Sequence, residues 1–351
     1  GGGICHTLEE LEKITESGLA SSLSHQVLIE KCLLGWKEIE YEVMRDAANN
    51  CITICNMENI DPPGIHTGDS IVVAPSQTLT DKEYQMLRSA SLKIIRALGI
   101  EGGCNIQFAL DPNSEDYRII EVNARLSRSS ALASKATGFP IARISSLLAA
   151  GLDLDEIPYW RDGTLEKYTP SGDYVVVKFA RWAFEKFPGV EDRLGTQMRA
   201  VGEVMSIGKN YKEAFQKAIR SREDGRYGLG FARDYNRRSL EELMALLNEP
   251  SSERQFIMYE ALRKGASPEA LFEKTHIKTW FIKQMQELAE IYHQTKMPDR
   301  VMPRLIEILD GHVDAIHRKI RKLFFLHPVM IPSPATGKPM SQIISSRQSI
   351  N

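Results

Sequence analysis

The spacing of apolar residues changes at about residue 237, and this change limits the architectures open to the chain. Before it, stretches of alternating apolar and polar residues, typical of half-buried strands, are mixed with stretches of helical spacing. After it only helical spacing is found, in 240–247, 253–263, 268–274, 278–294, 304–310 and 312–325. We therefore predict an α+β domain over 1–237, an all-α helical domain over 238–330 and a polar tail, 331–351, that we expect to be disordered.

Composition argues against several kinds of partner. The net charge is -2 and no strongly basic domain is visible, so we expect no nucleic-acid partner. No apolar run approaches the ~20 residues of a membrane helix, so we expect no membrane partner. The cysteines are odd in number and lack framework spacing, which predicts free thiols in a reducing, cytoplasmic environment. Cys51 and Cys55 have an even separation within a predicted strand and are expected to share one of its faces.

The first part of the chain predicts a sheet built from hairpins. A turn-forming sequence at 46–50 joins the strands predicted at 37–45 and 51–55, and a loop at 111–117 joins those at 105–110 and 118–123. Further strands are predicted at 26–33, 70–74, 172–179 and 201–207. Helices are predicted at 7–17, 79–98, 127–138, 140–150 and 211–222.

The strand pair at 105–123 has the residue types of a metal site. Alternation places the polar side chains of Asn105, Gln107, Glu121 and Asn123 on one face, and leaves an apolar face of Ile106, Phe108, Ile120 and Val122 for the core. One carboxylate with amide oxygens suits Mg²⁺, which binds few carboxylates together with substrate phosphates. Arg125 and Arg128 follow at once and are suited to anionic oxygens. The alternative is a solvated strand face without a ligand.

A second candidate is the loop 64–70, in which Gly64 and Gly68 flank His66. Glycines let a backbone approach a ligand closely. A histidine in a loop is also often only a surface hydrogen-bonding group, and the pattern alone does not choose. Glu38, taken by itself, is a strand carboxylate without an assigned role.

These segments together resemble the large chain of carbamoyl-phosphate synthetase. The strings that carry the resemblance are Gly-Trp-Lys-Glu at 35–38, Gly-Ile-His-Thr-Gly-Asp-Ser at 64–70, Val-Val-Ala-Pro at 72–75, Asn-Ile-Gln-Phe at 105–108 and, most specific by its length, the stretch 121–138. The family uses the ATP-grasp fold twice, and 129–133 resembles the first copy, which phosphorylates bicarbonate with ATP to carboxyphosphate. The helices after about residue 237 resemble the family's oligomerisation domain.

The resemblance implies a role for each matching residue. Those that would act on bicarbonate and the transferring phosphoryl group are Arg125, Arg128 and, from the closing loop, His66. Those that would bind Mg²⁺ or Mn²⁺ are Gln107, Glu121 and Asn123, and Gln107 and Glu121 would also belong to the ATP-binding residues.

It also implies residues around the nucleotide and a potassium ion. The loop that would close on ATP contains Gly64, Ile65 and His66. Lys31 and Leu33 would lie beside the adenine and act through their backbones, which tolerates the lysine where some members have glutamate. The carboxylate of Glu38 would face the ribose near a K⁺ site, whose other contacts would be Asn59, Asp61 and Ser70.

The resemblance carries expectations about the whole protein. The family's first half has an N-terminal region ahead of the point where this chain starts, so we expect an N-terminally incomplete ATP-grasp domain with little or no turnover alone. The implied partners are ATP, bicarbonate, a glutaminase subunit or fused domain, and further copies of the chain through the helical domain. Pyrimidine and arginine biosynthesis both stay open as the pathway.

Two other functions stay open beside this one. The first is a non-catalytic subunit-association module. It is motivated by the apolar stripe of Phe281, Met285, Leu288 and Tyr292 in 278–294, although packing within the chain is the commoner use of such a stripe. Another ATP-grasp ligase, resembling biotin carboxylase, is the second alternative, and the stretch 125–138 disfavours it.

Overall fold

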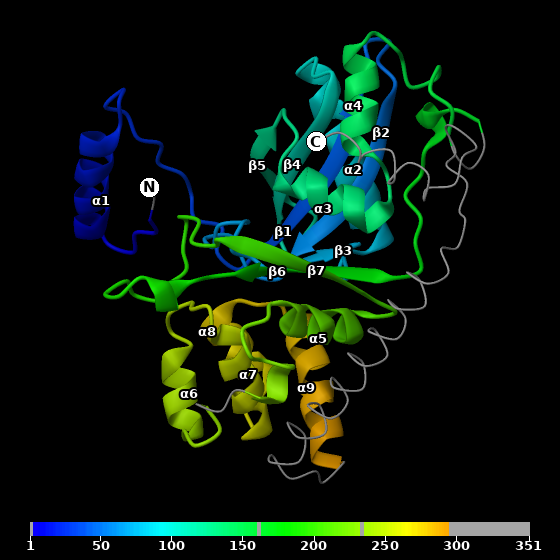
Figure 1. Cartoon of the computed structure of the whole chain (residues 1–351). Coiled ribbons are helices and arrows are strands. Elements are labelled where there is room, and N and C mark those ends of the chain that lie inside the picture. The colour runs from blue at the N-terminus through cyan, green and yellow to red at the C-terminus, as the bar shows by residue number, and fades with distance from the viewer. Residues whose placement is uncertain (1–2, 160–162, 232–234, 295–351) are drawn as a thin grey trace, which may run out of the picture. The chain divides into compact units, whose positions relative to one another are not determined.

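The computed structural model describes residues 3–159, 163–231 and 235–294, and its centre is a seven-stranded antiparallel sheet (Figure 1). The strand order is β5-β4-β1-β2-β3-β6-β7. The strands are β1 (Lys37–Arg45), β2 (Cys51–Asn59), β3 (Val72–Ala74), β4 (Gly102–Leu110), β5 (Tyr117–Asn123), β6 (Val175–Arg181) and β7 (Gly202–Gly208). The predicted mixture of strands and helices is confirmed for the described residues, as are both predicted hairpins.

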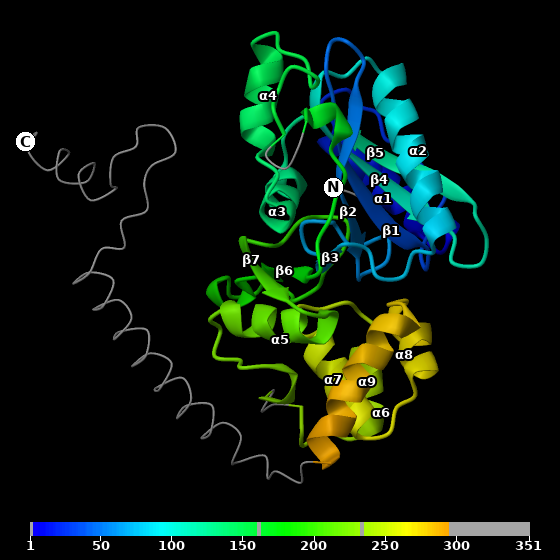
Figure 2. The same cartoon turned by 90° about the vertical axis from the view of Figure 1, so that its right-hand side faces the viewer.

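Helices cover both faces of the β1–β5 part of the sheet (Figure 2). Helix α2 (Asp81–Ala97) packs on one face, where alternate residues of β1 and β4 join it in an apolar cluster. Helices α3 (Arg128–Thr137) and α4 (Ile141–Ala149) pack on the other face. Both α2 and α3 begin with a capping box, at Thr80 and Ser127, which satisfies backbone N–H groups that have no partner within the helix.

The helices after β7 share one apolar core with the β6–β7 hairpin. They are α5 (Tyr211–Ser221), α6 (Leu240–Leu246), α7 (Arg254–Arg263), α8 (Pro268–Thr275) and α9 (Thr279–Gln294). Phe281 and Met285 of α9 are buried in this core, with Leu288 packed against it. The predicted stripe of α9 therefore serves packing within the chain, as far as its side chains are described. A domain boundary near residue 237 stays a prediction, because the same core lies on both sides of it.

Helix α1 (Leu8–Ser21) begins as predicted at Thr7, but the strand predicted at 26–33 is wrong. That segment is irregular and mostly exposed, because no described strand pairs with it, and Leu28 is 81% exposed. Short 3-10 turns occur at Leu165–Lys167, Phe184–Lys186 and Leu229–Phe231. The helices predicted at 304–310 and 312–325 and the polar tail lie outside the described residues. None of the described helices is long and apolar enough to cross a membrane.

Two β-bulges overturn predictions that relied on strict alternation. One lies between Glu42 and Val43 in the β1–β2 pair, so Cys55 faces the α3 side while Cys51 packs beside the α2 cluster. The predicted common face of the two cysteines is therefore wrong, whereas the prediction of free thiols is confirmed. The other bulge pushes Ile120 out of register in the β4–β5 pair, where it is 41% exposed rather than in the core.

A buried ion pair links the end of the β2 region to the helices. Arg254, at the start of α7, donates from Nε and Nη2 to the two carboxylate oxygens of Asp61, at 2.7 and 2.5 Å. Both side chains are at most 3% exposed. The backbone N–H of Ile71, just before β3, also donates to Asp61, so this carboxylate has donors from two separate segments.

We predict that Arg254→Leu lowers the free energy of unfolding by about 3–5 kcal/mol, because it leaves a buried carboxylate without its cation. Urea unfolding, followed by circular dichroism, measures this change. The double variant Asp61→Asn/Arg254→Leu should lose clearly less than the sum of the two single variants. Additive losses would contradict a direct coupling of the pair.

Candidate functional site

The candidate site lies on the sheet face that α3 and α4 cover. Residues directly opposite in antiparallel strands share a face. Glu38, Glu40 and Glu42 of β1 therefore share one face with their polar partners on the neighbouring strands, Asn59, Gln107 and Asn105. The next strand adds Glu121 opposite Gln107 and Asn123 opposite Asn105. Toward the other end of the strands this face becomes apolar, which leaves a polar region beside the start of α3.

The edge of this face holds a chain of polar contacts. Asn123 donates from Nδ2 to Oε1 of Glu121 at 2.7 Å, and Arg125 donates from Nη2 to Oδ1 of Asn123 at 3.2 Å. Gln107 lies across from Glu121 on the neighbouring strand. The structure thus brings together four of the residues predicted to hold a metal and an anion.

The interior of the face contains oxygen atoms without partners. Asn59 and Asn105 donate to Glu40 at 2.8 and 3.1 Å, and Asn105 also donates to Glu42 at 3.3 Å. Within the described residues, Oδ1 of both asparagines and Oε1 of Glu42 are buried and accept no hydrogen bond. Buried acceptors of this kind favour a cation or a proton donor in their vicinity.

Burial changes the acidity of the carboxyls on this face. It raises the pKa of Glu42 to about 7, and the charge of Glu40 adds to this effect against hydrogen bonds from Ser130 and Asn105. Burial also raises the pKa of Glu38 well above its usual value, and the nearby charges of Glu40, Asp61 and Glu121 act in the same direction.

One buried lysine opposes this negative charge. Lys178 of β6 pairs with Val72 of β3, which pairs with Asn59 of β2, so all three lie on the same face. The Nζ of Lys178 donates to the backbone oxygen of Thr67 at 3.0 Å. Burial lowers its pKa, while several carboxylates, including Glu203 and Glu40, oppose the shift. No sequence pattern had singled out this residue.

We predict that Glu42→Gln stabilises the chain at pH 8 by roughly 1–3 kcal/mol and has little effect at pH 5. The folded chain keeps this carboxyl protonated up to about pH 7, whereas the unfolded chain ionises it above about 4.5. Unfolding therefore releases a proton between these values, and the contribution of Glu42 to stability falls as pH rises through this window. Urea unfolding from pH 5 to 8 tests this, and a difference independent of pH would contradict it.

The loop containing His66 is attached to the segment before β7. The buried carboxylate of Asp69 accepts hydrogen bonds from the backbone N–H groups of Arg199 and Ala200 and from the indole of Trp182, at 2.6–3.1 Å. The backbone N–H of His66 also donates to Gly195 at 2.8 Å. Any movement of this loop must therefore involve residues 195–200.

The same segment reaches the predicted anion-binding arginine. Arg128, the first residue of α3, donates from Nη1 to the sulfur of Met198 at 3.2 Å. That sulfur would lie 2.7 Å from a Cβ at Gly68, so a larger residue there would displace the flexible side chain of Met198. Nδ1 of His66 accepts from the backbone of Gly68 at 2.9 Å. His66 and Arg128 thus meet the same short segment from two sides.

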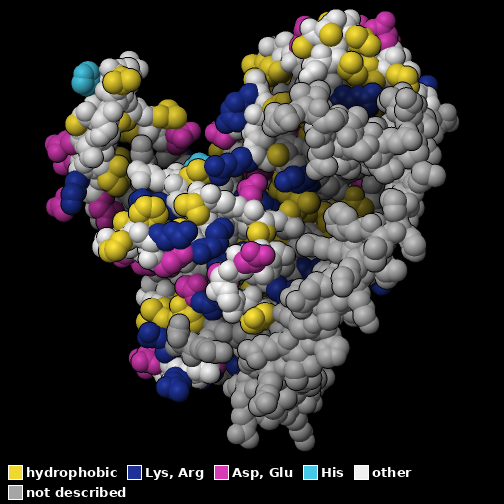
Figure 3. Space-filling model, in the orientation of Figure 1, with side chains coloured by type: hydrophobic (Ala, Val, Ile, Leu, Met, Phe, Trp, Pro, Cys, Tyr) yellow, Lys and Arg dark blue, Asp and Glu magenta, His cyan; other side chains and the backbone are white. Residues whose placement is uncertain are grey.

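A cavity of about 800 Å³ adjoins the loop. It is lined by Gly64 and Ile65 of the loop, by residues near α1, and by the segments 190–199, 247–250 and 274–277. Its size lies within the range of small-molecule sites. Figure 3 shows the surface hollowed between α1 and the strands, with both basic and acidic side chains along the hollow. Gln107 and Glu121, two of the residues predicted to bind a metal, do not line this cavity.

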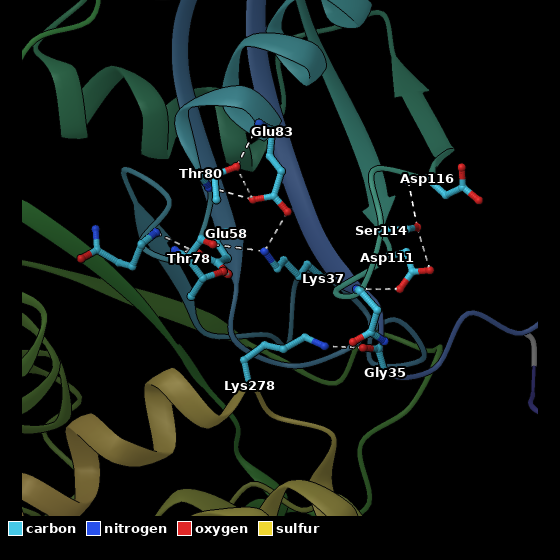
Figure 4. Close-up of polar contacts among 12 residues, drawn as sticks. Gly35, Lys37, Glu58, Thr78, Thr80, Glu83, Asp111, Ser114, Asp116 and Lys278 are labelled. Atoms are coloured by element: carbon cyan, nitrogen blue, oxygen red, sulfur yellow. Dashed lines mark hydrogen bonds and ion pairs between the residues drawn. The ribbon is translucent and has the colours of Figure 1, made fainter.

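The chain that leads into β1 is fixed by two lysines (Figure 4). Lys278, just before α9, donates to the backbone oxygen of Gly35, and Lys37 donates to Thr78 and Glu83 at 3.1 and 3.2 Å. Burial, together with the charge of Lys37, lowers the pKa of Lys278 to about 8. In the sequence, these contacts lie after Lys31 and Leu33, which are predicted to flank adenine, and before Glu38.

The remaining predicted residues are placed as follows. Lys31 is exposed in the irregular segment, and the backbone oxygen of Leu33 accepts from Trp36 in a turn. Asp61 is occupied by Arg254, and the hydroxyl of Ser70 donates to the backbone of Ile71 at 3.3 Å. Glu38 and Asn59 lie opposite each other, so this pair of the four predicted potassium contacts is adjacent by register.

Sequence reasoning missed Glu40, Glu42, Lys178, Asp69 and Met198. The two glutamates had a signal, since they continue the alternation that starts at Glu38. Lys178 stands in an apolar run and Asp69 in a glycine-flanked loop, and only tertiary contacts show that each is buried with partners.

The oxygen-rich set at the sheet edge fits a hard cation. Glu121 supplies one carboxylate and Gln107 and Asn123 supply amide oxygens, a set that suits Mg²⁺ when phosphates complete the coordination. Three or more His, Cys, Asp or Glu side chains gathered for a metal are not found among the described residues.

Comparison with known proteins assigns the class. Residues 1–157 match the family model described as "Carbamoyl-phosphate synthase L chain, ATP binding domain". Residues 203–309 match "Carbamoyl-phosphate synthetase large chain, oligomerisation domain". The chain belongs to the family of carbamoyl-phosphate synthetase large chains, as the sequence resemblance predicted.

Individual relatives give the extent of the likeness. The chain is 54% identical over 296 residues to the N-terminal section of the carbamoyl phosphate synthase large chain of Methanopyrus kandleri, covering 84% of this chain and 52% of that one. It is 56% identical over 292 residues to the large chain of Thermomicrobium roseum, covering 83% and 27%. The chain thus spans about half or less of these relatives. A biotin carboxylase domain from Hydrogenobacter thermophilus superimposes with a TM-score of 0.49 at 14% identity, over 82% and 63% of the two chains, which is too weak a likeness to support an argument.

Proposed function

We propose that this chain carries the part of a carbamoyl-phosphate synthetase that phosphorylates bicarbonate with ATP to give carboxyphosphate and ADP. The observation that supports it most is the contact chain Glu121–Asn123–Arg125 beside Gln107, at the start of α3. The exposed and half-buried side chains of this contact chain would hold a cation and an anion at the edge of the sheet face, and the chain belongs to a family of ATP-using ligases, which supports the proposal.

In the proposed reaction, a bicarbonate oxygen attacks the γ-phosphorus of ATP, and the bond to the β,γ-bridging oxygen breaks. Gln107, Glu121 and Asn123 would hold Mg²⁺ or Mn²⁺, which neutralises phosphate charge when bound. Arg125 and Arg128 would orient bicarbonate and stabilise the charge that develops on the transferring group. The protein's main contribution is thus positioning and electrostatics.

The loop of Gly64, Ile65 and His66 would cover the nucleotide and exclude water from carboxyphosphate, which hydrolyses readily. The contacts of Asp69 and His66 mean that segment 195–200 would move with this loop. Lys31 and Leu33 would contact adenine, and Glu38 the ribose. A K⁺ ion would lie near Glu38, Asn59 and Ser70, while Asp61 would act only by exchanging part of its contact with Arg254.

The proposal extends to partners. A glutaminase subunit or domain would supply ammonia in a cytoplasmic enzyme of pyrimidine or arginine biosynthesis. Copies of the chain would associate through the region that matches the oligomerisation domain. That match also favours the second candidate function, a subunit-association module, and light scattering after gel filtration tests both, because a strict monomer argues against association.

We predict that Glu121→Gln weakens binding of Mn²⁺ in the presence of ATP by more than about tenfold, because a neutral amide replaces the carboxylate at the metal. Electron paramagnetic resonance of free Mn²⁺ measures this binding. The matched control is Glu115→Gln, an exposed carboxylate of the neighbouring β4–β5 loop, which should bind like the unchanged chain.

Release of ADP with and without bicarbonate tests the reaction itself. We expect little turnover from the chain alone, and any stimulation by bicarbonate should disappear in Glu121→Gln. If Glu121→Gln binds Mn²⁺ as tightly as the control Glu115→Gln, the assignment of Glu121 to the metal is wrong. Bicarbonate-stimulated release that persists in Glu121→Gln would overturn the assignment of the reaction to this edge.

A further inference from the structure

One buried lysine has no role in the reaction proposed above. Lys178 of β6 is 6% exposed and is the only buried lysine among the described residues. Its neighbours in the strand, Val177 and Phe179, face the apolar core shared with the helices, whereas Lys178 faces the polar side of the sheet. Lysine is almost never fully buried unless it is paired, because removing its charge from water is costly. The protein around this ammonium group must therefore stabilise it.

The ammonium group of Lys178 reaches the loop 64–70. Its Nζ donates to the backbone oxygen of Thr67 at 3.0 Å, and Thr67 stands between His66 and Gly68 in the loop. The hydrogen bonds described above for His66 and Asp69 attach the loop to the segment 195–200 instead. Among the contacts of this loop, the one with Lys178 therefore comes from the polar face of the sheet.

The same ammonium group acts on the buried carboxylates. Burial lowers the pKa of Lys178, while the negative charges of several carboxylates, Glu203 and Glu40 foremost, oppose this shift. Burial likewise raises the pKa of Glu38, and the charge of Lys178 acts against that shift. A cation on this face would meet the same carboxylates. Because like charges repel, Lys178 and a bound cation would each weaken the attraction of the face for the other.

We propose that Lys178 is a positioning residue with two effects: it holds the loop 64–70 at the polar face of the sheet, and it is the counter-charge of the buried carboxylates, which limits how tightly this face binds a cation. It acts through the backbone of Thr67 and through the charge of Glu40, without contacting the nucleotide or the reacting atoms. The importance of the loop rests on the proposed function. Both effects can be measured without ATP or turnover, so their test does not depend on the proposed reaction.

Replacement of the lysine separates this role from a merely structural one. Lys178→Met keeps an unbranched apolar side chain but removes the charge and the hydrogen-bond donors. A loss of packing alone would loosen the loop and would also weaken any cation site on the face. Loss of the counter-charge loosens the loop but strengthens cation binding. The two readouts should therefore change in opposite directions.

Binding of Mn²⁺ to the whole chain without nucleotide, followed by electron paramagnetic resonance, tests the counter-charge. We expect Lys178→Met to bind Mn²⁺ at least about fivefold more tightly than the unchanged chain. The matched control is Lys186→Met, an exposed lysine beyond the end of β6, which should change the affinity by less than about twofold. The gain should disappear in the double variant Glu40→Gln/Lys178→Met. Unchanged or weaker binding by Lys178→Met, or a gain that persists in the double variant, would overturn the proposal.

Hydrogen exchange of the loop amides tests the attachment of the loop. The backbone N–H groups of Gly68, Asp69 and Ser70 all donate to His66, so their exchange reports opening of the loop. We expect them to exchange about three- to tenfold faster in Lys178→Met than in Lys186→Met, while the amides of α9 keep their rates. Equal loop exchange in the two variants, or a similar increase in α9, would contradict the proposal. If Lys178→Met fails to fold, Lys178→Gln, which is also neutral, decides by the same two measurements.

Discussion

The burial of negative charge on one face of the sheet governs much of this structure. Glu38, Glu40 and Glu42 follow one another on β1 and are each at most 3% exposed. Moving carboxylates out of water is costly unless hydrogen bonds, a cation or protonation compensates. The structure uses all three, through the amides of Asn59 and Asn105, the buried ammonium of Lys178, and raised pKa values at Glu38 and Glu42. These three effects offset only part of the cost of burying the carboxylates. The remaining negative charge would attract a cation to this face.

Two buried aspartates connect the segments next to this face with the rest of the chain. Asp61 fixes the end of the β2 region to α7, and Asp69 fixes the loop of His66 to the segment before β7. Both carboxylates are fully buried and have several donors each, so they act as fixed points. The glycine-flanked loop between them is therefore short and held at both ends. Its opening would need the rearrangement of segment 195–200, where Met198 also contacts Arg128.

The sequence predicted most elements because their local signals agree with their packing. The capping residues Thr80 and Ser127 and the left-handed Gly138 mark the helices α2 and α3 where the structure has them. The bulges were not predictable, because an extra residue such as Ile120 changes which side chains share a face without leaving a mark in composition. The segment 26–33 has the composition of a buried strand, but a strand also needs a partner, and no described strand supplies one.

From the sequence, only the part of the candidate site that lies on a single strand pair was predicted. Gln107, Glu121 and Asn123 depend on alternation within a hairpin, which a sequence reveals, and the bulge lies just beyond the positions that matter. Lys178 and Asp69 depend on β6 pairing with β3 and on a loop meeting the segment before β7, which are contacts between residues far apart in the chain. The sequence pattern therefore identifies the proposed ligand-binding groups of one hairpin. The residues that balance the buried charge around them are placed by tertiary contacts, which the pattern does not show. The electrostatic balance of this site is thus a property of the whole sheet, and a change in β6 can alter it without touching any proposed ligand.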